Sequence, residues 1–223
     1  MSARDEIQGG PSPGSNRRYD SSRRREQARI QRMRVLASAR RLFLDQGFAA
    51  TTLAAVAADA DVSVEMIYKA FRNKAGLLKE VFDFAVAGDD EPVPMVDRDF
   101  AHRIRSDPDP RKKLSLFAEH MAESMPRAAP VYLLGRAAAA AEPEIKALHS
   151  QWREAQLSGL GALATHLDEG GHLRPGLSAE RARDLLWTIH STEVYELLVL
   201  ERGWPIGEYR EFLARSTAAA LLP

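Results

Sequence analysis

Apolar residues recur at three- and four-residue spacing along most of this 223-residue chain, which is the period of one face of a helix. No stretch alternates apolar and polar residues as a half-buried strand would. The pattern therefore predicts an all-α protein without internal repeats. It divides into an N-terminal three-helix unit containing a helix-turn-helix and a larger C-terminal helical region.

The helix-turn-helix is predicted in residues 51–74. A first helix, 52–60, has one apolar face made by Leu53, Val56, Ala57 and Ala60, and the Thr51/Thr52 pair supplies a hydroxyl cap. Ser63 caps a second helix of about 64–71. Its inner side is predicted to carry Val62, Ile67 and Phe71. Its outer side carries Val64, Glu65, Met66, Tyr68 and Lys69, a short face that suits a groove better than a core.

Two longer helices are predicted on either side of this pair. The preceding helix runs from about Arg23 to Gln46, and Gly47 ends it in a left-handed conformation. Its predicted buried stripe consists of Ile30, Met33, Leu36, Ala39, Leu42 and Phe43. Asn73 is expected to cap a following helix from residue 74 to about 87.

The C-terminal region is predicted to form further helices at about 97–106, 110–124, from 130 through the 137–141 alanine run, 143–168, 178–202 and 205–220. Proline or glycine lies near most of their ends. The last two helices are apolar on more than one face. A helix of that kind needs two packing partners.

Composition limits the possible classes of protein. The chain has no cysteine, so disulfides and thiolate metal sites are excluded. No apolar run approaches the ~20 residues of a membrane-spanning helix, and no signal sequence is present, so we expect a soluble, cytoplasmic protein.

Charge is unevenly distributed although the formal net charge is zero. Residues 1–80 hold 15 Lys/Arg and 9 Asp/Glu, whereas residues 81–223 hold 16 and 22. Only the N-terminal part is therefore suited to a polyanion. Residues 1–22, rich in Gly, Pro and Ser, are predicted to be a flexible basic arm, either simply solvated or reaching into a DNA minor groove.

The same N-terminal region resembles the DNA-binding domain of the TetR family of transcriptional regulators over about residues 28–82. An L-F-x-x-x-G-F stretch precedes Thr-Thr and then V-S-x-x-x-I-Y-x-x-F-x-N-K. The residues that carry this resemblance are Leu42, Phe43, Gly47, Phe48, Thr51, Thr52, Val62, Ser63, Ile67, Tyr68, Phe71, Asn73 and Lys74. The resemblance implies a DNA-binding domain at 23–82 and an effector-binding and dimerisation domain at 83–223.

By this resemblance, Thr51 or Thr52, Tyr68 and Lys74 contact phosphates, while other residues face the bases. The complete DNA-binding set is Thr51, Thr52, Ser63, Val64, Glu65, Met66, Tyr68, Lys69 and Lys74. Glu65 could instead only stabilise the helix start. Two positions depart from the family pattern: Asp61 replaces a turn glycine, and Ala70 replaces a common polar contact.

The resemblance also implies a homodimer on a palindromic operator and a small-molecule effector in the C-terminal region. The dimer contacts are expected at Leu185, Leu197, Leu198, Tyr209, Phe212 and Leu213. The candidate effector contacts are Phe117, Met121, Met125, Tyr132, Trp152, Gln156, Trp187, His190 and Tyr195. Aromatic residues and methionines at helical spacing are more often core than cavity lining, so each of these residues could instead belong to an ordinary core.

Other classes of function have less support in the sequence. His166 and His172 flank two acidic residues but lack a third metal ligand at a fixed spacing. His190 and Glu193 could form an acid–base pair, although a polar contact for a ligand or a hydrogen-bonded core histidine fits His190 better. We therefore expect no metal, no cofactor and no catalysis. The first hypothesis is a ligand-responsive, dimeric transcriptional regulator. The alternatives are a DNA-binding regulator without a small-molecule effector and an all-helical enzyme.

Overall fold

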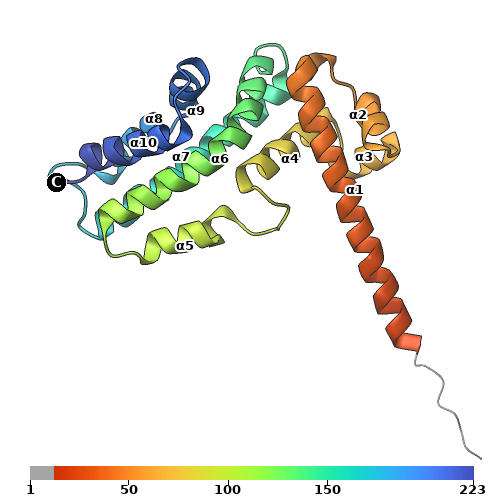
Figure 1. Ribbon diagram of the computed structural model, residues 1–223, viewed down its shortest axis with the longest axis horizontal. Coiled ribbons are helices and arrows are strands. Elements are labelled where there is room, and N and C mark those ends of the chain that lie inside the picture. Colours follow the sequence, from red (N-terminus) through yellow and green to blue (C-terminus); the bar gives the residue numbers. More distant parts are fainter. Residues whose placement is uncertain (1–12) are drawn as a thin grey trace, which may run out of the picture.

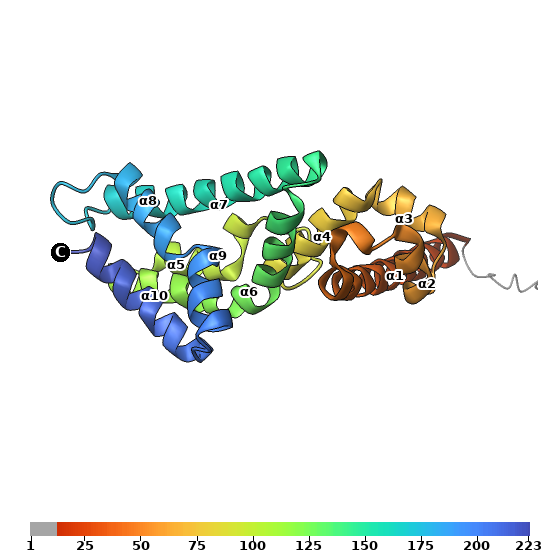
Figure 2. The same ribbon diagram turned by 90° about the horizontal axis from the view of Figure 1, so that it is seen from above.

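The computed structural model describes the backbone of residues 13–223 and the side chains from residue 23 onward. Throughout this range the chain forms helices and connecting segments without a strand, which confirms the all-α prediction. Helices α1 to α3 gather at one end of the molecule and α5 to α10 at the other, with α4 between them (Figure 1; Figure 2).

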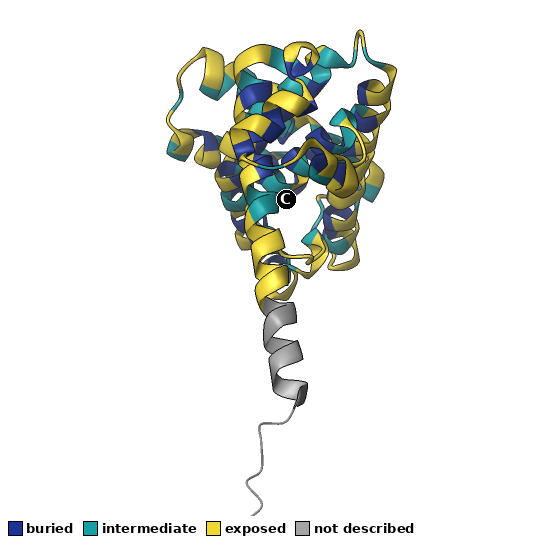
Figure 3. Cartoon of the chain, turned by 90° about the vertical axis from the view of Figure 1, so that its right-hand side faces the viewer, coloured by how far each residue is buried: buried dark blue, intermediate teal, exposed yellow. Residues whose placement is uncertain are grey.

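Helix α1 (Pro13–Ala50) begins earlier than the sequence pattern predicts. Proline is favourable at a first helical position, because its fixed φ suits the helix and its missing N–H would have no partner there. The predicted flexible arm therefore overlaps this helix, and its residues 1–12 lie outside the described part. Residues 23–30 of α1 are exposed and extend away from the rest of the protein (Figure 3). Ile30, placed in the buried stripe by its spacing, lies on these turns and is exposed.

The helix-turn-helix and the helix after it have the predicted bounds within a residue. They are α2 (Leu53–Ala60), α3 (Val64–Phe71) and α4 (Lys74–Ala87). The hydroxyls of Thr52 and Ser63 accept hydrogen bonds from the amides of Ala55 and Met66, and the Asn73 side chain accepts one from the amide of Gly76. These caps satisfy amides that have no partner within the helix, so local sequence alone defines each start.

The core of the N-terminal unit is continuous with the rest of the protein. Phe43 stacks on Phe48 with ring centroids 5.7 Å apart, and Ile67 is completely buried beneath α3. Both α1 and α4 also pack against α6, so the predicted domain boundary at residues 82 and 83 falls inside a helix that contacts both parts.

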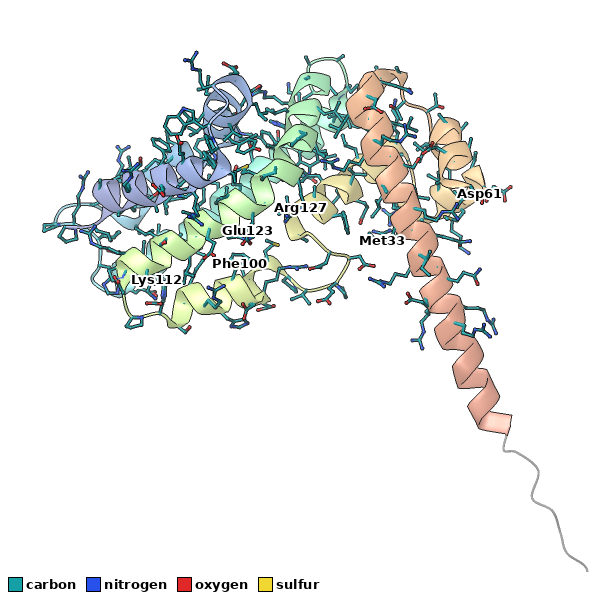
Figure 4. The ribbon with its side chains drawn as sticks, in the orientation of Figure 1. Met33, Asp61, Phe100, Lys112, Glu123 and Arg127 are labelled. Atoms are coloured by element: carbon teal, nitrogen blue, oxygen red, sulfur yellow. The ribbon has the colours of Figure 1, made fainter. Side chains whose placement is uncertain are left out.

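The C-terminal region is built around α6. Its elements are η1 (Met95–Asp97), α5 (Asp99–Ser106), α6 (Pro110–Ala138), α7 (Pro143–Glu169), α8 (Ala179–Ile189), α9 (Thr192–Tyr195), η2 (Glu196–Glu201) and α10 (Ile206–Leu221). Helix α6 contacts α1, α4, α5, α7, α9 and α10. Phe100 of α5 and Arg127 of α6 mark two of these contacts in Figure 4.

Two helices predicted at 110–124 and after Pro130 are a single helix. Pro126 and Pro130 both lie inside α6. An internal proline removes one backbone hydrogen bond and favours a helix end. Packing on several sides of α6 compensates for that loss, which a local pattern cannot show.

The helix predicted at 178–202 is instead interrupted. Helix α8 ends at Ile189, and α9 starts two residues after the His190 C-cap. The Ser191 hydroxyl accepts from the amide of Val194, so it caps a new helix where the apolar spacing indicated continuity. The six residues of η2 then form a π-helix.

Candidate DNA-binding face and ligand cavity

The outer face of α3 is available to a partner. Ser63, Val64, Glu65 and Lys69 are exposed, and Tyr68 is 54% exposed. The opposite face is buried through Ile67 and Phe71. Met66 differs from the prediction, because it is partly buried and packs against the core of the N-terminal unit.

The turn before α3 directs this face outward. Asp61, at the outer tip of the turn in Figure 4, has φ 54° and ψ 54°, and its amide donates to the carbonyls of Ala57 and Ala58. Aspartate tolerates this left-handed conformation better than most residues, so it can replace the expected glycine. The departure from the family pattern therefore preserves the turn.

The two threonines before α2 have different environments. Thr51 is buried, and its hydroxyl donates 2.8 Å to the carbonyl of Gly47 and lies 3.1 Å from that of Leu42. Thr52 is exposed, and its hydroxyl caps α2. Of this pair, Thr52 is the residue whose hydroxyl lies at the surface.

Lys74 also contributes to the fold. Its Nζ donates to the carbonyls of Phe48, Ala49 and Thr51 at 2.8, 3.3 and 3.1 Å, and it lies 4.3 Å from the centroid of the Phe48 ring. The ammonium therefore neutralises the carbonyl-rich end of α1. A phosphate bound by Lys74 would have to compete with these three carbonyl oxygens for the N–H groups of the ammonium.

The junction between α3 and α4 contains a constraint that the sequence analysis missed. A Cβ added to Gly76 would lie 2.2 Å from the carbonyl oxygen of Phe71, so only glycine fits there. Arg72, just before α4, is exposed and has φ 69°. As the C-cap of α3, it is a further basic residue beside the exposed face of that helix. The spacing of residues in the sequence indicates neither the need for glycine at position 76 nor the position of Arg72.

A cavity of about 700 Å³ lies between α1, α4, α6, α7 and the segment 89–95. Five of the nine candidate effector contacts line it: Met121, Met125, Tyr132, Trp152 and Gln156. Its size is in the range of small-molecule sites. Segment 89–95 and the α4 residues Phe82 and Phe84 also line it but were not predicted.

A second, narrower cavity of about 250 Å³ adjoins the first and contains a sixth candidate, Phe117. Met121 and Gln156 line both cavities. The second cavity extends between α5, α6 and α7 and is lined by apolar residues such as Phe100, Ile104 and Leu160.

The other three candidates lie outside both cavities. Trp187 is partly buried under the guanidinium of Arg153, and Tyr195 packs edge-on against Tyr209. His190 is fully buried, with its Nε2 3.0 Å from the Thr217 hydroxyl. Burial lowers the pKa of His190 to about 3, so the ring is neutral at physiological pH.

The predicted dimer contacts also divide into two groups. Tyr209 and Leu213 are completely buried within the chain, where they hold α10 against α6. Leu197 is 52% exposed, and Leu185, Leu198 and Phe212 are partly exposed. Leu200 and Ile206, which were not in the predicted set, add exposed apolar surface near Leu197 in the chain.

The residues considered for metal binding or catalysis have other partners. The Nε2 of His166 lies 2.9 Å from the buried Nζ of Lys113, and Glu193 pairs with Arg136 rather than with His190. Among the described residues, no three His, Asp or Glu side chains gather as a metal site would require. None of the described helices has the length and apolar character needed to cross a membrane.

Residues 35–81 match the family model described as bacterial regulatory proteins, tetR family. This segment contains the C-terminal part of α1, all of α2 and α3, and about the first half of α4. The search of curated protein sequences found no match.

Several solved structures share the fold of the whole chain at low sequence identity. NalD of Pseudomonas aeruginosa, the secondary repressor of the MexAB-OprM multidrug efflux pump, is 18% identical, with a TM-score of 0.66 over 88% of this chain and 98% of NalD. A proposed transcriptional regulator from Saccharomonospora viridis in complex with choline is 17% identical, with a TM-score of 0.65 over 86% of this chain and 97% of that protein.

The fatty acid degradation regulator FadR of Bacillus halodurans is also similar. It is 17% identical, with a TM-score of 0.67 over 82% of this chain and 96% of FadR. The chain therefore carries a tetR-family helix-turn-helix segment and has the fold of TetR-family transcriptional regulators.

Proposed function

We propose that this protein is a dimeric repressor that binds a palindromic operator through α3 and leaves it when a small molecule enters the C-terminal region. The observation that carries the proposal is the division of α3 into two faces. Ile67 and Phe71 anchor the helix, while Tyr68 and Lys69 point outward. A short anchored helix with exposed polar side chains fits a DNA major groove.

The residues of α3 would have two kinds of role. Tyr68 and Thr52 have hydroxyls at the surface and are suited to phosphates, which position a protein on the duplex. Val64, Glu65 and Lys69 are suited to base edges, which specify the sequence. The partly buried Met66 supports the helix more than it reaches toward DNA.

Dimerisation would use the exposed apolar residues of η2 and the start of α10. Leu197, Leu200 and Ile206 are large apolar residues exposed to solvent. A twofold dimer presents two copies of α3, and its symmetry is that of a palindromic site. We expect this regulator to act in the cytoplasm, without a cofactor.

The cavity argues for an effector over regulation by another protein alone. It is large enough for a small molecule and is lined by Phe82 of α4 as well as by α6 and α7. Because α4 also packs against α1 and α3, a ligand that favours one position of α4 changes the position of α3. Repression would then be relieved by the ligand's preference between the two states.

Fluorescence anisotropy with the DNA upstream of the protein's own gene tests the proposal. We expect tight binding that weakens steeply with salt. Tyr68→Phe removes one hydroxyl and should weaken binding to all duplexes about tenfold, since a hydrogen bond to a charged group contributes about 1.5–3 kcal/mol. Lys69→Met should change the preferred sequence.

Tyr195→Phe is the matched control, because Tyr195 is buried in the C-terminal region. It should leave DNA binding unchanged. Equal affinities of the wild-type protein and Tyr68→Phe for DNA, at every salt concentration, would contradict the assignment of α3 as the DNA-binding helix.

A further inference from the structure

Arg32 on α1 contacts the C-terminal end of α3 and also lines the larger cavity. Its side chain forms part of the cavity wall, together with Leu36 one turn further along α1. Its Cζ lies 5.0 Å from the centroid of the Phe71 ring, and Phe71 is the last residue of α3. Met33 marks this turn of α1 in Figure 4. Arg32 is therefore a direct side-chain connection between the cavity and the helix that we propose binds DNA.

The guanidinium of Arg32 is held in place from the side of α4. Its Nη2 donates to Oε2 of Glu80, which also lines the cavity. The two side chains are 37% and 35% exposed, so a molecule in the cavity could reach them. A planar guanidinium can lie against an aromatic ring and donate to a carboxylate at the same time, whereas an ammonium cannot. Glu80 thus fixes where the guanidinium lies relative to Phe71.

Phe71 is well placed to control the orientation of α3. Its ring is 3% exposed and, with Ile67, anchors the inner face of an eight-residue helix. Its carbonyl oxygen lies so close to the first turn of α4 that a Cβ on Gly76 would be only 2.2 Å away. The backbone at the end of α3 is therefore fixed by α4, and the ring is fixed in part by Arg32. A shift of this ring would turn Tyr68 and Lys69, which lie on the outer face.

Other arginines on α1 have partners outside α3. Arg29, one turn before Arg32, pairs with Asp90 of the cavity-wall segment and with Glu26. Arg41 pairs with Asp59 on α2. These two arginines carry the same charge on the same helix, so Arg29 can serve as a matched control for the contact between Arg32 and Phe71.

We propose that Arg32 is a positioning residue for DNA recognition. Its guanidinium, held by Glu80, sets the orientation of α3 through Phe71, and its place in the cavity wall makes that orientation depend on what occupies the cavity. A ligand that favours a displaced guanidinium shifts α3, and DNA bound to α3 changes the cavity wall in return. This inference rests on the proposed function and adds the side chain through which the cavity and α3 communicate.

Fluorescence anisotropy with two duplexes tests the positioning role. One is the DNA upstream of the protein's own gene, and the other is a shuffled duplex of the same length and composition. Arg32→Lys keeps the charge but lacks the planar group, so affinity for the upstream duplex should fall about three- to tenfold. Affinity for the shuffled duplex should stay within about twofold, because it depends mainly on charge. Arg29→Lys should change neither affinity.

Glu80→Gln separates positioning from charge, because the two effects have opposite signs. The variant has one negative charge fewer, so electrostatics alone predicts tighter binding to any DNA. The positioning role predicts weaker binding to the upstream duplex, since the guanidinium loses its charged partner. The proposal requires weaker binding to the upstream duplex in both Arg32→Lys and Glu80→Gln. It is overturned if either variant keeps or gains affinity for that duplex.

Trp152 can report whether the effect reaches the cavity. It stacks on Phe82 of α4 with ring centroids 4.1 Å apart, and both residues line the cavity. Protein labelled with fluorotryptophan gives a fluorine NMR signal for Trp152, which Trp152→Phe assigns. Saturating upstream DNA should shift this signal in the wild type and in Arg29→Lys, but not in Arg32→Lys. Absence of a shift in the wild type, or equal shifts in the wild type and Arg32→Lys, would overturn the coupling.

Hydrogen–deuterium exchange of the free protein separates this inference from the proposed function. Arg32→Lys should raise the exchange of amides 68–72 severalfold, whereas Arg29→Lys should not. If the wild type does not distinguish the two duplexes, the regulator proposal is refuted, and the exchange result alone decides whether Arg32 positions α3. If the wild type and Arg32→Lys distinguish the duplexes equally well, only the role of Arg32 is refuted.

Discussion

Lys74 supports the fold at a position that we propose lies near DNA. Its ammonium joins the carbonyls that end α1 to the first residue of α4, next to the buried Thr51 hydroxyl. The position of α2 and α3 relative to α1 and α4 therefore depends on charged and polar contacts as well as on apolar burial. A residue assigned to phosphate binding by its sequence position thus also stabilises the unit that presents α3.

Replacing Lys74 should therefore affect stability as well as DNA binding. Lys74→Met keeps most of the stem over Phe48 but leaves carbonyls without their donor, which should lower the free energy of unfolding by about 1.5–3 kcal/mol. Urea unfolding monitored by circular dichroism measures this change. The control is Lys79→Met on the same helix, where an exposed pair with Asp83 contributes at most about 1 kcal/mol. Equal losses in the two variants would contradict a structural role for Lys74.

His190 should make stability depend on pH. Its Nε2 donates to the Thr217 hydroxyl, which itself donates to the Leu213 carbonyl at 2.6 Å, and burial lowers the pKa of the ring to about 3. In the unfolded chain the pKa is about 6.5. Between these values only the unfolded state takes up a proton, so stability falls as pH falls. The slope for this one group reaches about 1.4 kcal/mol per pH unit.

Urea unfolding between pH 7 and pH 4.5 measures this slope. His190→Gln retains an N–H donor but does not titrate, so its stability should fall less steeply than that of the wild-type protein. His120, whose pKa burial lowers to about 4, adds a slope common to both proteins. Parallel curves for wild type and variant would show that His190 is not buried in its neutral form.

Individual elements differ in how far local sequence determines them. Helices α2, α3 and α4 agree with the sequence prediction because Thr52, Ser63 and Asn73 cap them locally. The continuity of α6 through Pro126 and the break after Ile189 depend on packing between helices instead. Residue spacing found the outer face of α3 and six cavity residues. It could not place segment 89–95 in the cavity wall or bury Tyr209 and Leu213, since these depend on tertiary contacts.

The segment between α4 and η1 links the cavity to the N-terminal unit. Asp90 accepts from Nε and Nη2 of Arg29 on α1 at 2.6 and 2.8 Å, and the same segment lines the larger cavity. Asp90→Asn should weaken this ion pair. Hydrogen–deuterium exchange of amides 88–94 should then increase severalfold, because the segment loses a contact to α1. Asp83→Asn is the control, since its partner Lys79 lies one turn away in α4. Unchanged exchange in Asp90→Asn would show that Arg29 does not hold the segment.

At the scale of the whole molecule, the excess of basic residues and the exposed leucines lie in different parts of the chain. Basic residues predominate in the N-terminal third, which contains α3, whereas the exposed leucines lie on η2 near the C-terminus. In a twofold dimer joined through η2 and α10, the N-terminal units would be free to face DNA. Both DNA affinity and ligand control then depend on that interface, because one copy of α3 contacts only one half-site.

Placing charges on this apolar surface tests that arrangement. Leu197→Asp combined with Leu200→Asp replaces side chains that are 52% and 50% exposed, so the folded chain should tolerate both changes. A dimer that buries these leucines would instead be disrupted by unpaired buried charges. Sedimentation velocity should show a monomer, and operator affinity should fall roughly 100-fold because the two half-sites no longer reinforce each other.

Val96→Asp, an equally exposed apolar position on η1, should leave the dimer intact. A dimer that survives both leucine substitutions would exclude η2 from the interface, and DNA binding retained by a monomer would show that one α3 is enough.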